Sequence, residues 1–483
     1  MKLRRILTVT YLIMLCTLLP LYMQSGYYKL GEAKGLVFMA LSGAFFIALV
    51  IVLLVKKNKL SPGVFGVLIF TNIVTFLFAV DKKTALLGLE GWRMGLVTIL
   101  LMIFFACLLS EGIDLNGYIV AAILITSFII SIITILERFG INIIPVASDD
   151  TSFVATVGNI NWLTGFLAVF VPMGVGIATT RKRFSPLFFA SEVYVIAGLM
   201  ALLVQGSDSA LLVIIGTYAF LWWLSLRDRD AFKSYLIQIF TLGIAMVAVH
   251  VLMLFAGDRY NYSGNMLITL CKTHTGIILM AAMLFIYRLS RFFEEVNLEW
   301  KKDLYRRGML ILTAIGIAAG LLVFFGIYTD FFGNGRGIIW RISGDMYSQL
   351  TPFRKIVGVG QDCYYSYAYS TPEWSESFLN VFEGYRLTNA HNIYLTTLIE
   401  NGVMGLLGLL FVFGYTLTEL VKASEKKKHA AIICALPIVS YLVNGLVSFS
   451  QILSASYVFM ILGYALFVTR DDAGDIKQDQ VSE

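Results

Sequence analysis

Two polar side chains late in the chain are placed where they could take part in a reaction. His391 stands at the start of an apolar run, with Asn389 and Asn392 beside it. Histidine is the usual general base near neutral pH, so His391 is a candidate base; the alternative is a polar residue at a helix mouth. Arg336 directly follows the turn Gly333-Asn334-Gly335, and the forked guanidinium of arginine suits a phosphate or pyrophosphate. The residues alone therefore make His391 a candidate for a catalytic or binding role and Arg336 a candidate for binding a phosphate group.

Three further cations are candidates for the same phosphate-binding role. Arg93 stands at the outer end of an expected helix, and Arg341 lies in the same polar stretch as Arg336. Lys272 lies about 10 Å inside a helix expected to begin at Asn265, at about 1.5 Å per residue. The alternative for such residues is a side chain that extends to the phosphates of the lipid surface.

No pattern of metal ligands accompanies these residues. The five cysteines contain no Cys-x-x-Cys pair, and four of them sit inside apolar runs. The polar stretch has acidic residues, but no carboxylate pair with the spacing of metal ligands. We therefore expect no metal and no other cofactor.

The elements that must position these residues belong to a membrane protein. Of the 483 residues, 58% are hydrophobic and 14% are charged, whereas soluble domains have about 25% charged residues. The mean hydropathy is +0.80. Runs of about 20 apolar residues, the length needed to cross the hydrocarbon core, predict an all-α integral membrane protein with about fourteen spans. These are residues 6–23, 35–55, 63–80, 92–110, 117–136, 162–180, 187–204, 210–226, 236–256, 265–287, 308–328, 392–415, 430–447 and 452–468.

The chain divides accordingly into four parts. Residues 1–328 carry eleven expected spans, 329–391 form one long polar loop with short amphipathic helices, 392–469 carry three more spans, and 470–483 form a polar tail. Alternate loops hold 24 and 12 of the 37 lysines and arginines. By the positive-inside rule, both termini are cytoplasmic and the long loop is outside.

Four segments resemble one family in their order and residues. They are Gly158-Asn159-Ile160-Asn161 with Pro172, Gly335-Arg336 with Trp340, Gly358-Val359-Gly360, and Ala390-His391-Asn392-x-Tyr394-Leu395 followed by Glu400-Asn401-Gly402. The chain is similar in these segments to the O-antigen ligase and O-antigen polymerase superfamily of bacterial polysaccharide assembly.

The resemblance implies a glycosyltransferase C-like membrane enzyme of the bacterial plasma membrane. Its donor would be a glycan on a polyprenyl pyrophosphate, its acceptor a glycan or a lipid, and no nucleic acid would be involved. His391 would activate the acceptor hydroxyl, and Arg336, with Arg93 or Lys272, would hold the pyrophosphate without a metal. The motif residues Asn159, Asn161, Asn392 and Tyr394, with Arg341, would contact the substrate. With an unperturbed histidine as base, the rate would fall as the pH drops through about 6.5.

One position departs from the family pattern. The family often has Ser-Arg-Gly at the outer start of a middle helix, where this chain has Asp208 within Gln205-Gly206-Ser207-Asp208-Ser209. The second pyrophosphate-binding cation is therefore in doubt, and Lys272 or Arg259 could replace it.

A transporter or flippase is the alternative function, because about fourteen spans alone would equally permit it. Transporters usually show repeated halves and charged residues near the middle of the membrane. In this chain the polar residues gather in one long loop instead, which favours an enzyme. Ligase and polymerase share the same donor, and the sequence leaves that choice open.

Overall fold

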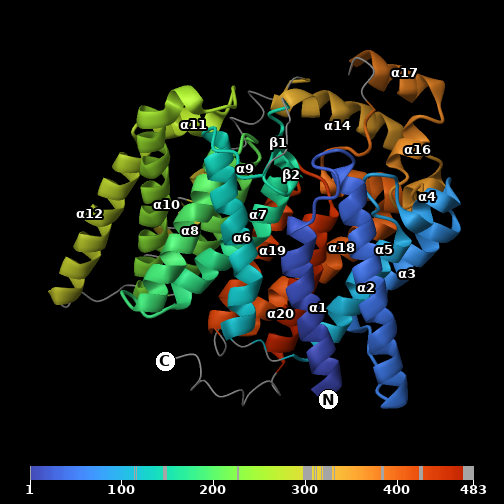
Figure 1. The fold of residues 1–483 in the computed structure, drawn as a ribbon, viewed down its shortest axis with the longest axis horizontal. Helices are drawn as coiled ribbons and strands as arrows, with labels where there is room; N and C mark the ends of the chain where they lie inside the picture. The colour runs from blue at the N-terminus through green and yellow to red at the C-terminus, as the bar shows by residue number, and fades with distance from the viewer. Residues whose placement is uncertain are drawn as a thin grey trace.

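The computed structural model gives an all-helical protein whose long helices stand side by side (Figure 1). It describes residues 2–113, 115, 117–144, 150–225, 228–296, 307–308, 310–311, 313–316, 318, 329–330, 332–381, 386–423 and 428–470. Within these residues, nine helices are long and apolar enough to cross a membrane, judged by length and composition. The expectation of a helical, multi-pass membrane protein is confirmed at this level.

The first part of the chain forms six helices and one 3₁₀ turn. They are α1 (Lys2–Leu21), α2 (Leu30–Val55), η1 (Gly63–Phe65), α3 (Gly66–Leu77), α4 (Lys82–Leu87), α5 (Leu96–Ser110) and α6 (Gly117–Arg138). The short helix α4 is capped by Asp81, whose carboxylate accepts hydrogen bonds from the N–H groups of Lys83 and Thr84 at 3.1 Å. Figure 1 shows α4 at the end of the bundle opposite the N-terminus.

The middle part begins with a small antiparallel hairpin and continues with six helices. The elements are β1 (Phe153–Val154), β2 (Gly158–Asn159), α7 (Ile160–Thr180), α8 (Pro186–Val204), α9 (Ala210–Ser225), α10 (Arg229–Ala256), η2 (Gly257–Arg259), α11 (Met266–Lys272) and α12 (Thr275–Glu295). The structure differs here from the single helix expected over residues 265–287. His274 has a left-handed backbone (φ 60°), which a continuous α-helix excludes, so α11 and α12 are separate.

The expected polar loop is largely folded. Its described residues form α14 (Phe332–Ser348), α15 (Pro352–Val357), α16 (Tyr364–Ala368) and α17 (Pro372–Val381), which lie over the bundle end opposite the N-terminus (Figure 1). Met346, Tyr364, Trp374 and Phe378 belong to one buried apolar cluster shared by these helices. The folded segment therefore has a small core, which it shares with α4 and α18 (Ile393–Ala423) through Ala85 and Ile399. The chain ends in α18, α19 (Lys428–Asn444) and α20 (Ile452–Thr469).

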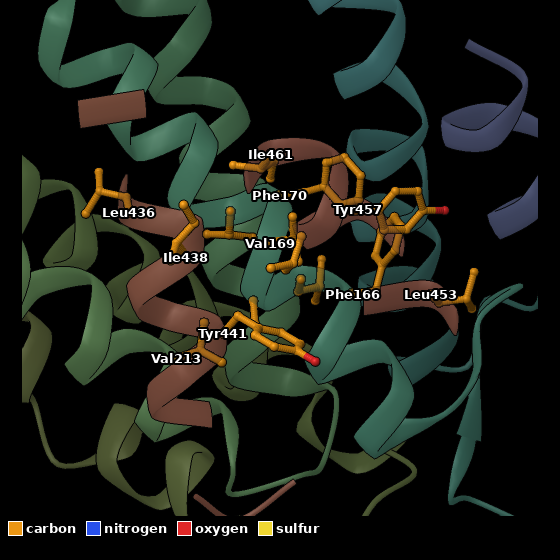
Figure 2. Close-up of a cluster of buried hydrophobic side chains, with 14 of the residues drawn as sticks. Phe166, Val169, Phe170, Val213, Leu436, Ile438, Tyr441, Leu453, Tyr457 and Ile461 are labelled. Carbon is orange, nitrogen blue, oxygen red and sulfur yellow. The ribbon is translucent and has the colours of Figure 1, made fainter. Parts of the chain in front are cut away.

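The centre of the bundle is α7, which packs against α8, α19 and α20. It is apolar on every side, and 83% of its most apolar 18-residue window is buried, as expected for a helix without a polar face. Phe166 and Phe170 of α7 lie beside Tyr457 of α20 (Figure 2). Nearby, α5 and α20 approach closely, because a Cβ at Gly463 would lie 2.2 Å from the carbonyl oxygen of Ala106.

Helices occupy the expected spans with one exception, the segment 308–328, most of which lies outside the described residues. Four of these helices are shorter than the nine long ones. They are Gly63–Leu77, Leu96–Ser110, Ala210–Ser225 and His429–Asn444, at 10–17 residues each. Such lengths fall below the roughly 20 residues that span a hydrocarbon core upright.

Candidate functional site

Arg336 lies in α14 and reaches the start of α7. Its Nη1 donates to the carbonyl oxygen of Gly333 at 2.8 Å, and its Nη2 lies 3.5 Å from Oδ1 of Asn161. Its Nε is buried and has no hydrogen-bond partner in the described part of the chain. Burial lowers the pKa of Arg336, while the nearby Asp208 carboxylate raises it, and an arginine stays protonated throughout the physiological range. A charged guanidinium with an unused donor therefore lies beside the start of α7.

His391 is held in a strained loop directly before α18. Its backbone is left-handed (φ 47°), a conformation that costs a non-glycine residue about 1–3 kcal/mol. Its N–H donates to Oδ1 of Asn389 at 2.9 Å. Burial and the positive charge of Arg336 lower the pKa of His391 to about 3. The imidazole is therefore neutral at physiological pH, so the condition of an unperturbed pKa near about 6.5 is not met.

The loop between α8 and α9 surrounds the contact of Asn161 with Arg336. Ser207 donates its hydroxyl to Oδ1 of Asn161 at 2.8 Å and lies 2.7 Å from the hydroxyl of Ser209. Asp208 accepts a hydrogen bond from the N–H of Met266 at 3.1 Å, and burial raises its pKa. An anion thus stands beside Arg336 where the resembled family often has a second cation.

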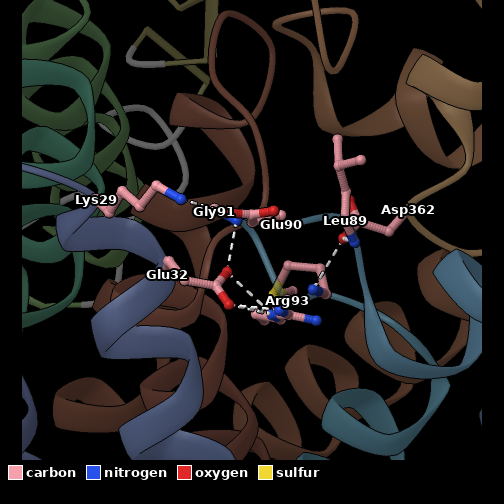
Figure 3. Close-up of polar contacts among 8 residues, drawn as sticks. Lys29, Glu32, Leu89, Glu90, Gly91, Arg93 and Asp362 are labelled. Carbon is pink, nitrogen blue, oxygen red and sulfur yellow. Dashed lines mark hydrogen bonds and ion pairs between the residues drawn. The ribbon is translucent and has the colours of Figure 1, made fainter.

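Arg93 is anchored by an acidic partner from α2. Its Nε donates to both carboxylate oxygens of Glu32, at 2.9 and 3.0 Å, and its Nη2 contacts the same carboxylate. These bonds raise the pKa of Arg93. Glu32 also accepts the N–H of Gly91 at 2.7 Å. Figure 3 shows Glu32 beside both Arg93 and the N–H of Gly91. Arg93 is therefore engaged mainly with Glu32.

Asp362 fixes the other side of the same loop. Its Oδ2 accepts hydrogen bonds from the N–H groups of Leu89 at 2.6 Å and Met94 at 3.0 Å (Figure 3). Burial raises the pKa of Asp362, which lies beside the buried carboxyl group of Glu400. The loop that carries Trp92 and Arg93 is thus tied to the folded segment 332–381 by one titratable carboxylate, which the sequence reasoning did not identify.

An aromatic wall joins these groups, and it too was missed from the sequence. The ring centroid of Trp92 lies 5.5 Å from that of Trp162 and 4.9 Å from that of Phe449. Phe449 in turn meets the His391 ring edge-on at 5.1 Å. The sequence did offer a signal for these tryptophans, because each is next to a candidate site residue. Trp92 precedes Arg93, and Trp162 follows Asn161.

A cavity with a volume of about 130 Å³ opens below this wall. Trp92, Phe449, Thr388 and Asn389 line its part nearest His391. Its other walls are mainly apolar side chains of α3, α5, α18 and α20, with Asp362 and Glu400 among them; the apolar members include Leu68, Ile99, Met102, Leu409, Phe413 and Phe459. The cavity is therefore mainly apolar, with a few polar side chains such as Thr388, Asn389 and Glu400 in its lining.

Four of the residues expected to bind substrate make other contacts, and a fifth, Lys272, is exposed. Asn159 caps α7 through the N–H of the residue two positions on. Asn392 caps α18 and donates to a carbonyl at the end of α19, and the Tyr394 hydroxyl donates to another α19 carbonyl. Arg341 pairs with an acidic side chain at 2.8 Å, and Lys272 is exposed at the end of α11. These contacts explain all but Lys272 without a ligand.

Two motifs of the family resemblance meet each other in space. Helix α18 is interrupted at Gly402 (φ 69°), which frees the carbonyl of Glu400 to accept the N–H of Gly360 at 2.9 Å. A Cβ at Gly358 (φ 80°) would lie 2.1 Å from the same carbonyl oxygen. These glycines serve the close packing of backbone on backbone.

The arrangement combines one neutral imidazole, one charged guanidinium and an apolar cavity. It can accept a proton at His391 and bind an anion at Arg336. Within the described residues, no three His, Cys, Asp or Glu side chains are grouped to hold a metal ion. A scan against protein-family models finds no match, and a search of curated proteins finds none either.

Proposed function

We propose that the protein is a membrane glycosyltransferase that takes a glycan from a polyprenyl-pyrophosphate donor at the outer face of the bacterial plasma membrane. It would act as an O-antigen ligase-like enzyme or as a polysaccharide polymerase. The observation that carries the proposal is that the positive charge of Arg336, 55 positions from His391 in sequence, acts on the His391 imidazole, and that Asn389, two residues before His391, lines an apolar cavity. The cavity would take the first part of the polyprenyl tail.

The proposed reaction needs one base and one cation. A hydroxyl oxygen of the acceptor attacks the anomeric carbon of the donor, while the bond from that carbon to the pyrophosphate oxygen breaks. Neutral His391 takes the hydroxyl proton, and polyprenyl pyrophosphate leaves with the electron pair. Arg336 offsets the charge that grows on the leaving group. Because the charge of Arg336 lowers the pKa of His391, a bound pyrophosphate would ease protonation of the imidazole.

The proposal also includes a topology. The nine long helices, the four shorter ones and the segment 308–328 would together give about fourteen spans, with both termini cytoplasmic. The shorter helices would cross where neighbouring elements complete the path. Helices α14–α17 would then lie outside, where both donor and acceptor are expected.

Reconstitution separates this proposal from a transporter. Purified protein in vesicles would be supplied with a labelled polyprenyl-pyrophosphate glycan and a glycan or lipid acceptor. We expect label to become covalently attached to the acceptor, with release of polyprenyl pyrophosphate. Movement of intact donor between leaflets without transfer would instead identify a flippase.

A further inference from the structure

A second cavity lies at the other end of α7, away from His391. It has a volume of about 390 Å³ and is built where α7 and α9 end and where α10 and α19 begin. Three consecutive cations line it; they are Arg181, Lys182 and Arg183. Hydroxyls of Thr180 and Ser234 line it as well. Neither the proposed reaction nor the resemblance uses this cavity.

The charges in the cavity do not balance. Asp230 is the one acidic residue among its lining residues, all of which are described. Arg183 already pairs with Asp230, with 3.4 Å between its Nη1 and the carboxylate Oδ1. Its Nη2 also donates to the carbonyl oxygen of Asp230 at 2.6 Å and to the hydroxyl of Ser234 at 3.0 Å. Arg181 and Lys182 therefore leave an excess of positive charge.

One donor in the cavity is unused. The Nε of Arg181 is buried and has no hydrogen-bond partner within the described residues. A buried donor without a partner is unfavourable unless a ligand or water satisfies it. Arg181 lines a cavity with an excess of positive charge, and such a site favours an anion with several acceptor oxygens.

We propose that this cavity binds a phosphate group, carried either by the head of an anionic phospholipid or by a soluble phosphate. Leu221, Leu224 and Ile432 form the apolar side of the cavity, which suits the glycerol and upper acyl groups of a lipid. The site also lies on the face with more lysine and arginine, where anionic lipids attract basic residues. The inference does not depend on the proposed glycosyl transfer.

The test compares lipid binding by full-length variants. Native mass spectrometry would follow protein from mixed phosphatidylglycerol and phosphatidylcholine bilayers for wild type and the double variant Arg181→Gln/Lys182→Gln. The matched control is Lys56→Gln/Lys59→Gln, which removes two exposed lysines from another loop on the same face. We expect one retained phosphatidylglycerol in wild type and control, and about tenfold or greater loss of retention in the double variant.

A second arm identifies the source of the phosphate. Inorganic phosphate at millimolar concentration is expected to leave the retained lipid in place. If phosphate instead displaces the lipid, or if wild type retains phosphate and no lipid, the site binds soluble phosphate. Equal retention in wild type and double variant, with no response to phosphate, overturns the proposal. If the double variant fails to fold, Lys182→Gln alone, at an exposed position, provides the same comparison.

Discussion

Lowering the pH from about 7.5 to about 5.5 distinguishes a histidine with a lowered pKa from one with the usual histidine pKa. With a pKa near 6.5, the neutral fraction of His391 would fall about tenfold over this range. With the pKa lowered to about 3, more than about 99% of the imidazole stays neutral at both ends. We therefore expect His391 to contribute no loss of transfer rate across this range.

A buried pair of carboxyl groups is also sensitive to acid. Burial raises the pKa of Asp362, which lies beside the buried carboxyl group of Glu400, and the Asp362 carboxylate holds the loop with Trp92 and Arg93 through two backbone N–H groups. Protonation weakens a carboxylate as an acceptor, so activity should fall as this pair takes up a proton on acidification. Asp362→Asn keeps an acceptor oxygen without titrating and should reduce that fall.

The assay pairs single-turnover transfer with histidine-selective NMR, which is practical because the chain has four histidines. The His391 signal, assigned with His391→Gln, should not titrate between about pH 5.5 and 8 in wild type. In Arg336→Gln its midpoint should move up, because the charge of Arg336 helps to lower the pKa. A wild-type His391 that titrates near 6.5 would refute the reasoning.

The lowered pKa of His391 also affects stability. Below about pH 6.5, His391 binds a proton in the unfolded chain but not in the folded chain. Stability should therefore fall as the pH drops from about 6.5 towards 3, and the fall should be smaller in His391→Gln. Chemical denaturation of both proteins at several pH values measures the difference.

Other predictions follow from the charges and from the proposed topology. Arg336→Lys keeps the charge but loses the fork, so it should retain only part of the donor affinity, and Arg336→Ala less, in equilibrium binding of labelled donor. Asp208→Asn removes the anion beside Arg336 and should tighten donor binding; weaker binding would contradict this role. Transfer should survive a chelator, since cations replace a metal in the proposed reaction; loss restored by magnesium would contradict it. An impermeant thiol reagent applied to intact cells should label cysteine at Ser348 and not at Lys56, both exposed; the reverse pattern would invert the orientation.

The spans were predictable because their signal is local. A run of apolar residues long enough to cross the bilayer is visible in the sequence without any knowledge of neighbours. The break between α11 and α12 was missed because it depends on the left-handed conformation of His274, which follows a lysine and a threonine in an otherwise apolar run. Backbone conformation at a single residue leaves no periodic pattern.

The site was predictable in its residue types more than in its contacts. Arg336, His391 and Asn161 stand out as polar residues, and the structure brings them to the same end of the bundle. The lowered pKa of His391 and the loop anchor at Asp362 depend on burial between segments distant in sequence, which one sequence cannot show. Asn392 and Tyr394 looked equally polar but bind backbone carbonyls.

The central claim is that His391 takes a proton during glycosyl transfer while Arg336 holds the donor. Single-turnover transfer by His391→Ala, measured with saturating labelled donor beside wild type and Lys56→Gln, tests it most directly. We predict a rate about 10²–10⁴-fold lower for His391→Ala, with donor affinity little changed and the protein still in the membrane. Normal turnover by this variant, or loss of activity only through loss of the protein, would contradict the claim. His391 would then be only a structural residue in the loop before α18.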